Sequence, residues 1–61
     1  MDIKIRDKIL NTFAFNRYQL RLAYGIPGND KDDFNFAVNM FNHEVVMNGE
    51  QFLIDNYGKN E

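Results

Sequence analysis

The chain has 61 residues, of which 44% are hydrophobic and 26% are charged, and its formal net charge is −2. A chain of this length forms one domain and buries only about 60% of its unfolded surface, so its stability is marginal without a covalent staple or a partner. Cysteine is absent, which excludes disulfides and the usual structural zinc site. The composition is globular, and we expect a single helical domain over residues 1–58 with a frayed tail at residues 59–61.

Charge is distributed unevenly along the chain. Residues 1–24 contain five cations and two anions, a net charge of +3, whereas residues 25–61 contain two cations and seven anions, a net charge of −5. The two halves can attract each other inside the fold, or the first half can present a basic face to an anionic partner. The candidate contacts for such a partner are Lys4, Lys8, Arg17 and Arg21.

No segment has the roughly 18 to 20 consecutive apolar residues of a membrane span. The first ten residues alternate charge with isoleucine and lack the apolar block of a signal peptide. We therefore expect a cytoplasmic protein that does not interact with membranes.

The first predicted element is an amphipathic helix over residues 3–14. Its apolar positions fall on one face of a 3.6-residue period, namely Ile5, Ile9, Leu10 and Phe13. Asp2 can accept hydrogen bonds from the free amides at its start. A second, short helix is predicted from Asn16, because Asn16 followed three residues later by Gln19 resembles a capping box.

The end of this second helix is the clearest local signal in the sequence. Gly25 suits the left-handed position after a helix, Ile26 supplies the apolar contact of a Schellman-type cap, and Pro27 cannot continue a helix. The second helix is therefore predicted to end at Tyr24.

A third, long helix is predicted after the following turn, with Asn29 or Asp30 as its cap. Asp32 and Asp33 place negative charge against the positive end of its macrodipole. Five apolar residues then recur at helical spacing: Phe34, Ala37, Val38, Phe41 and Val45. This stripe is predicted to be core.

A second apolar stripe lies on the same helix, about 140° or more from the core stripe at 100° per residue. Its members are Phe36, Met40 and Met47, with His43 beside them. The first helix and the C-terminal segment can cover this stripe in a chain of this size. Otherwise it is a surface for self-association or for a partner, where Met and Phe are common anchors. These four residues are the candidate partner-binding residues.

The C-terminal segment allows two structures. Asn48-Gly49 between two apolar runs is typical of a β-hairpin that would pair residues 44–47 with residues 50–53. Alternatively, Asn48 ends the third helix and caps a fourth, short helix that ends at Gly58. The side chains packed inward would then be Phe52, Leu53 and Tyr57. The apolar runs do not alternate with polar residues, which favours the helix. The predicted fold class is all-α, a small three- to four-helix bundle, and the alternative is a helical core with a C-terminal β-hairpin.

The residue inventory offers no catalytic constellation. Serine and cysteine are absent, and Thr12 and His43 are the only threonine and histidine, so nucleophilic catalysis of the Ser–His or Cys–His type is impossible within one chain. His43 is followed only by Glu44, and adjacent helical residues point about 100° apart, so the two cannot form an orienting pair. One His with scattered carboxylates lacks the ligands of a metal site. We expect no enzymatic activity, no cofactor, no metal and no small-molecule substrate.

The favoured function is a small non-enzymatic protein-binding module: a regulator, inhibitor or adaptor that occupies the surface of a partner protein. Frequent Asn, Lys, Phe and Ile indicate an A/T-rich genome, such as that of a low-GC bacterium or its phages. A phage or mobile-element accessory protein is therefore the working hypothesis for its origin.

Two alternatives remain open. Residues 20–26 superficially resemble part of a helix-turn-helix, so a DNA-binding helix-turn-helix or winged-helix regulator is one of them. Nucleic acid is disfavoured because Arg21 stands where that motif needs a small residue, and because the helix that would enter the groove begins with acids. The other alternative is a structural or assembly component in which the second stripe meets a copy of itself, as in a homodimer.

Overall fold

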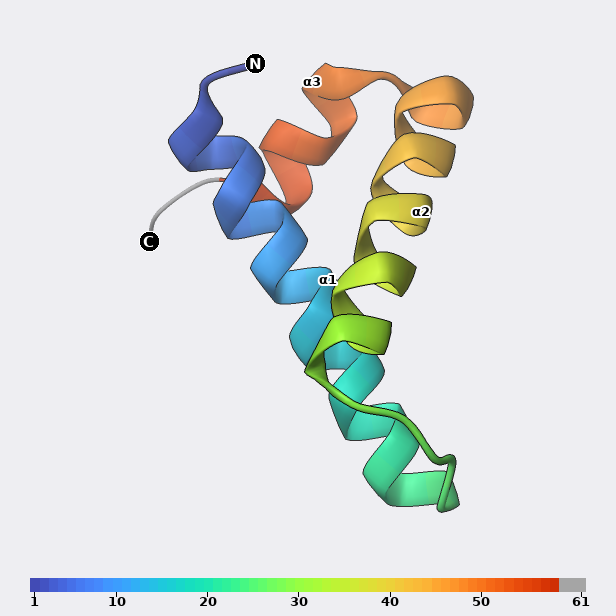
Figure 1. Cartoon of the computed structure of the whole chain (residues 1–61). Coiled ribbons are helices and arrows are strands. Elements are labelled where there is room, and N and C mark those ends of the chain that lie inside the picture. Colours follow the sequence, from blue (N-terminus) through green and yellow to red (C-terminus); the bar gives the residue numbers. More distant parts are fainter. Residues whose placement is uncertain (59–61) are drawn as a thin grey trace.

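The structure is a computed structural model, and it describes residues 1–58 (Figure 1). Helix α1 spans Ile3–Tyr24 and α2 spans Asp30–Asn48. The short α3, Glu50–Leu53, continues directly into a π-helical turn, η1, over Ile54–Gly58. No strand occurs among these residues, so the predicted all-α bundle is confirmed and the alternative C-terminal hairpin is wrong. The predicted frayed tail lies outside the described residues.

Helices α1 and α2 run antiparallel and diverge away from the connection between them, and α3 with η1 packs at the wide end (Figure 1). The core takes side chains from all three helices: Ile9, Leu10, Phe13, Ala37, Phe41 and Leu53. Leu53 is fully buried, and the Tyr57 ring meets the Phe13 ring edge-on with centroids 4.9 Å apart. These contacts attach the C-terminal segment to α1. Phe52 was also predicted to pack inward, but it is exposed because it points about 100° away from Leu53.

Helix α1 is one continuous element, so the predicted break between residues 14 and 16 is wrong. The segment contains neither Gly nor Pro, and an Asn inside a helix costs only about 0.7 kcal/mol relative to Ala. A break there would give up several backbone hydrogen bonds, each contributing about 1 kcal/mol. Asn16 therefore stays inside the helix and does not act as its cap.

Both predicted ends of the N-terminal helical region are confirmed. The backbone N–H of Lys4 donates to Asp2 Oδ1 at 2.7 Å, which caps α1. At the other end Gly25 adopts the left-handed conformation, with φ of 66°. The N–H of Ile26 donates to the carbonyl of Arg21 at 2.9 Å, which is the long hydrogen bond of a Schellman-type cap.

Helix α2 starts with the predicted cap. The N–H of Asp32 donates to Asn29 Oδ1 at 2.9 Å and the N–H of Asn29 donates to Asp32 Oδ2 at 3.2 Å, which together form a capping box. At the end of α2, Gly49 with φ of 87° separates it from α3, and α3 has no side-chain cap. The prediction that Asn48 caps the last helix is therefore wrong. The chain turns here because glycine tolerates this backbone conformation.

The predicted core stripe of α2 is only partly buried. Ala37 and Phe41 lie in the core, and Val38 and Val45 pack against it half-buried. Phe34 is 46% exposed, so its assignment to the core is wrong. Phe34 lies near the start of α2, far along the chain from the segment where Leu53 and Tyr57 complete the core. Periodicity alone cannot distinguish it from the buried members of the stripe.

Candidate functional site

Helix α2 presents three faces. One face packs into the core through Ala37 and Phe41. A second face is polar and exposed, and it contains Asn35, Asn39 and Asn42. The third, which we call the methionine face, consists of Phe36, Met40, His43 and Met47. Its members are spaced 4, 3 and 4 residues apart, so they form one row along the helix.

The methionine face is open to solvent. Met47 is 66% exposed, Phe36 and Met40 are 38% and 36% exposed, and His43 is also exposed. The fold covers the row only in part: Phe36 and Met40 keep about a third of their surface in solvent, and Met47 keeps about two thirds. Large apolar side chains that remain exposed in a contiguous row are typical of surfaces that contact another molecule.

One cation borders the methionine face. The Arg17 guanidinium of α1 lies over the Phe36 ring, with its central carbon 4.5 Å from the ring centroid. This cation–π contact holds Phe36 in place from one side. The face is therefore a row of three apolar side chains and His43, with a positive charge beside its first member.

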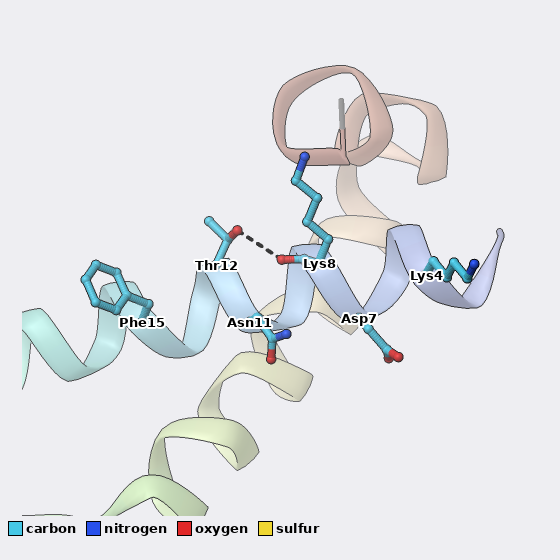
Figure 2. Close-up of a pocket in the computed structure, with 6 residues that line it drawn as sticks. All are labelled: Lys4, Asp7, Lys8, Asn11, Thr12 and Phe15. Carbon is cyan, nitrogen blue, oxygen red and sulfur yellow. Dashed lines mark hydrogen bonds between the residues drawn. The ribbon is translucent and has the colours of Figure 1, made fainter. Parts of the chain in front are cut away.

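The predicted basic residues do not form one surface. Lys4 and Lys8 are one turn apart and line a shallow hollow on α1 together with Asp7 (Figure 2). Arg17 follows Lys8 by nine residues, which is two and a half turns, so these two point to opposite sides of α1. Arg21 is engaged inside the fold. This separation does not favour the DNA-binding alternative, in which several cations must reach neighbouring phosphates.

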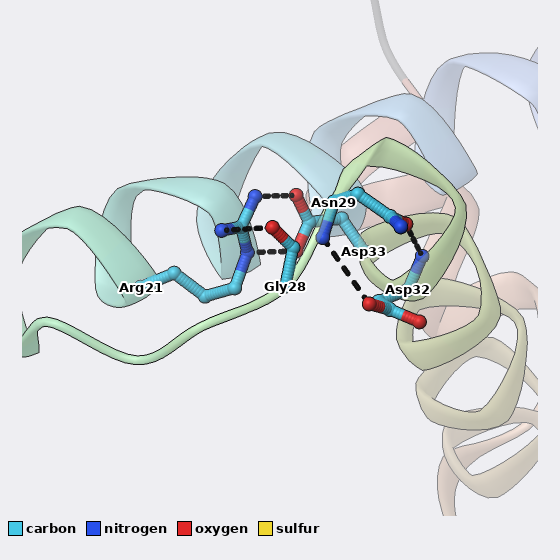
Figure 3. Close-up of polar contacts among 5 residues, drawn as sticks. All are labelled: Arg21, Gly28, Asn29, Asp32 and Asp33. Atoms are coloured by element: carbon cyan, nitrogen blue, oxygen red, sulfur yellow. Dashed lines mark hydrogen bonds and ion pairs between the residues drawn. The ribbon is translucent and has the colours of Figure 1, made fainter.

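Arg21 and Asp33 form an ion pair between α1 and α2 (Figure 3). Arg21 Nε donates to Asp33 Oδ1 at 2.6 Å and Arg21 Nη2 donates to Asp33 Oδ2 at 2.7 Å, while Nη1 donates to the carbonyl of Gly28 at 3.1 Å. Asp33 is only 3% exposed. The hydrogen bonds from Arg21 lower the pKa of the Asp33 carboxyl and raise the pKa of the Arg21 guanidinium. The pair joins the basic half of the chain to the acidic half, and its role is structural.

The sequence predictions missed an aromatic hollow between α1 and α2. We define it by Phe15 and Tyr18 of α1 and by Phe34 and Asp30 of α2, which line one open depression. The rings of Phe15 and Tyr18 lie 6.4 Å apart, and all three rings are exposed. The sequence did contain an indication of this hollow. Phe15 and Tyr18 are large aromatic residues that lie outside the predicted core stripe of residues 5–13, so they were candidates for an exposed surface.

No further chemistry or likeness identifies the site. Among residues 1–58 no group of three His, Cys, Asp or Glu side chains comes together as metal ligands do. None of the described helices is both long and apolar enough to cross a membrane. No protein-family model, no curated protein and no solved structure matches the chain. A function has to be inferred from the exposed surface itself.

Proposed function

We propose that the chain is a small, non-enzymatic protein-binding module that occupies an apolar groove of a partner protein with its methionine face. The exposure of Phe36, Met40 and Met47 in one row is the observation that carries the proposal. The spacing of the row, 36, 40, 43 and 47, is the spacing with which an amphipathic helix enters an apolar groove. The flexible, polarisable Met side chains suit such a contact because they adapt to irregular surfaces.

The energy available from this row sets the size of the interface. Fully burying a Phe or Met side chain stabilises by about 1.5–3 kcal/mol. Since the three apolar side chains are already partly buried, completing their burial contributes about 3 kcal/mol in total. Micromolar binding needs about 8 kcal/mol. The partner must therefore also contact neighbouring residues, and one charged candidate is Arg17, whose guanidinium lies over the Phe36 ring.

The double variant Met40→Glu/Met47→Glu tests the proposal against a matched control, Val46→Glu. Val46 is 82% exposed on the same helix, but it points about 100° away from Met47. Wild type and both variants would be immobilised and exposed to a lysate of the organism that encodes the chain. We expect at least one lysate protein to bind to immobilised wild type and to Val46→Glu, and not to bind to the double variant.

Two results would overturn the proposal. One is a bound set that is the same for all three baits, because the methionine face would then contribute nothing. The other is cooperative unfolding of the double variant, seen as loss of far-UV circular dichroism, because the row would then be part of the core. The proposal requires the double variant to stay folded, with a melting temperature close to that of Val46→Glu.

A second copy of the chain is the alternative occupant of the same face. The row contains no Asp, Glu, Lys or Arg, so two copies can approach without like-charge repulsion at the centre of the contact. Sedimentation equilibrium at about 10 µM and about 1 mM brackets the concentrations at which such weak pairs form. A dimer that is lost in Met40→Glu/Met47→Glu and kept in Val46→Glu supports self-association. A monomer at both concentrations excludes it.

A further inference from the structure

We infer that the aromatic hollow binds an arginine side chain of a partner protein. Phe15, Tyr18 and Phe34 supply three exposed aromatic rings to one depression between α1 and α2. The negative face of an aromatic ring attracts a cation placed over it. The site is separate from the methionine face and does not rest on the function proposed for that face.

The charge at the rim of the hollow selects a cation. Asp33 also lines the depression, but Arg21 already occupies its carboxylate (Figure 3). Asp30 is exposed, and it attracts Arg21 through its charge, whereas the hydrogen bonds of the Arg21 Nε and Nη2 go to Asp33. An incoming cation over the rings can therefore pair with Asp30 without breaking the Arg21–Asp33 hydrogen bonds.

Contacts between an arginine and an aromatic ring already occur within the fold. Each of its three arginines lies over an aromatic ring: Arg6 over Phe41, Arg17 over Phe36 and Arg21 over Tyr18. The Arg21 contact, at 5.6 Å, reaches a ring of the hollow from inside the fold. The other two rings of the hollow, Phe15 and Phe34, are not among the rings that the three arginines cover. An arginine from outside completes the arrangement.

Arginine fits better than lysine because its planar guanidinium stacks on a ring and pairs with a carboxylate at the same time. A protein fits better than a free small molecule because the depression is open to solvent. Sites for small molecules bury most of the surface of their ligand, which this depression cannot do. The contact therefore depends on a surrounding protein surface for most of its affinity.

The two candidate surfaces face different directions. Phe34 and Phe36 are two residues apart on α2, so their side chains point about 160° away from each other. A partner on the methionine face therefore leaves the hollow accessible, and the two sites can be tested independently.

An NMR titration of the ¹⁵N-labelled chain tests the inference. The probe is the capped peptide Gly-Gly-Arg-Gly-Gly, and its control is the same peptide with citrulline, which keeps the shape of arginine without the charge. We expect saturable shifts at Phe15, Tyr18 and Phe34, with a dissociation constant on the order of millimolar for so small a ligand. The citrulline peptide should bind about tenfold more weakly, since it lacks both the cation–π contact and the ion pair.

Two variants locate the contact. Asp30→Asn keeps the size of the side chain and should weaken binding by about two- to fivefold, the effect of losing one exposed ion pair. Phe52→Ala removes an equally exposed aromatic ring on α3 and should change nothing. The inference is overturned if no saturable shift occurs, if citrulline binds as well as arginine, or if Asp30→Asn binds like wild type.

Discussion

Replacing Leu53 with Ala measures how far α3 stabilises the whole fold. Leu53 is completely buried and is the only residue of α3 in the core cluster. A buried Leu→Ala change costs about 2–5 kcal/mol, and the value grows with the cavity that remains. Because α3 is only four residues long and can shift to fill part of the cavity, we expect about 3 kcal/mol. A chain of this size has a total stability of about 3–9 kcal/mol, so the variant should be close to unfolding.

Urea unfolding followed by far-UV circular dichroism is the assay. With a slope of about 1 kcal/mol per molar urea, typical of a very small domain, the loss should lower the midpoint by about 3 M. The control is Leu22→Ala, the same chemical change at a position that is 60% exposed on α1, where the stability should change by less than about 0.5 kcal/mol. If the two variants unfold at similar midpoints, Leu53 is not a core residue and the C-terminal segment does not stabilise the helix pair.

Substitutions at three further positions probe the turn at Gly25, the packing of Gly58 and the Arg21–Asp33 ion pair. Gly25→Ala should lower the free energy of unfolding by about 1 kcal/mol because of the left-handed backbone alone, since an added Cβ meets no atom within 4 Å. Gly25→Asn should lower the melting temperature less than Gly25→Ala does, because Asn tolerates this conformation better. Gly58→Ala should lose about 1–3 kcal/mol by crowding, because its Cβ would lie 2.8 Å from Ile5 Cγ2; an unchanged urea midpoint would contradict that packing. Asp33→Asn should be less stable than wild type at neutral pH. The pKa of Asp33 in the folded chain lies below its ordinary value of 3.8, so the extra stability of wild type over Asp33→Asn is present above pH 3.8 and is lost as the pH falls through the folded pKa. If the urea midpoints of the two proteins differ equally at about pH 7 and about pH 2, the ion pair does not stabilise the fold.

Helix ends were predictable because capping is local chemistry. Asp2, Gly25 and Asn29 act on backbone groups within a few residues of themselves, and each has the predicted role. The same reasoning failed at Asn16, where a residue able to cap was present but nothing ended the helix before it. It also failed at Asn48, because Gly49 supplied the turn. A cap stabilises a helix end once the chain turns there, but it does not make the chain turn.

The candidate surfaces were partly predictable. The row Phe36, Met40, His43 and Met47 follows from 100° per residue, and the sequence correctly placed it on one face of a single helix. Its exposure depended on where the third helix docks. The aromatic hollow required two helices to meet, with Phe34 of α2 opposite Phe15 and Tyr18 of α1.

The amino-acid sequence by itself determined that the chain has neither cysteine nor serine, and it determined where α1 ends and where α2 begins. It favoured an all-helical fold but left a C-terminal hairpin open. Tertiary structure decided that residues 3–24 form one helix, that Leu53 completes the core, and that Phe34 stays at the surface. The physical reason is range. Capping and periodicity act over a few residues, whereas burial depends on which distant segment covers a side chain, and neighbours along the chain do not encode that.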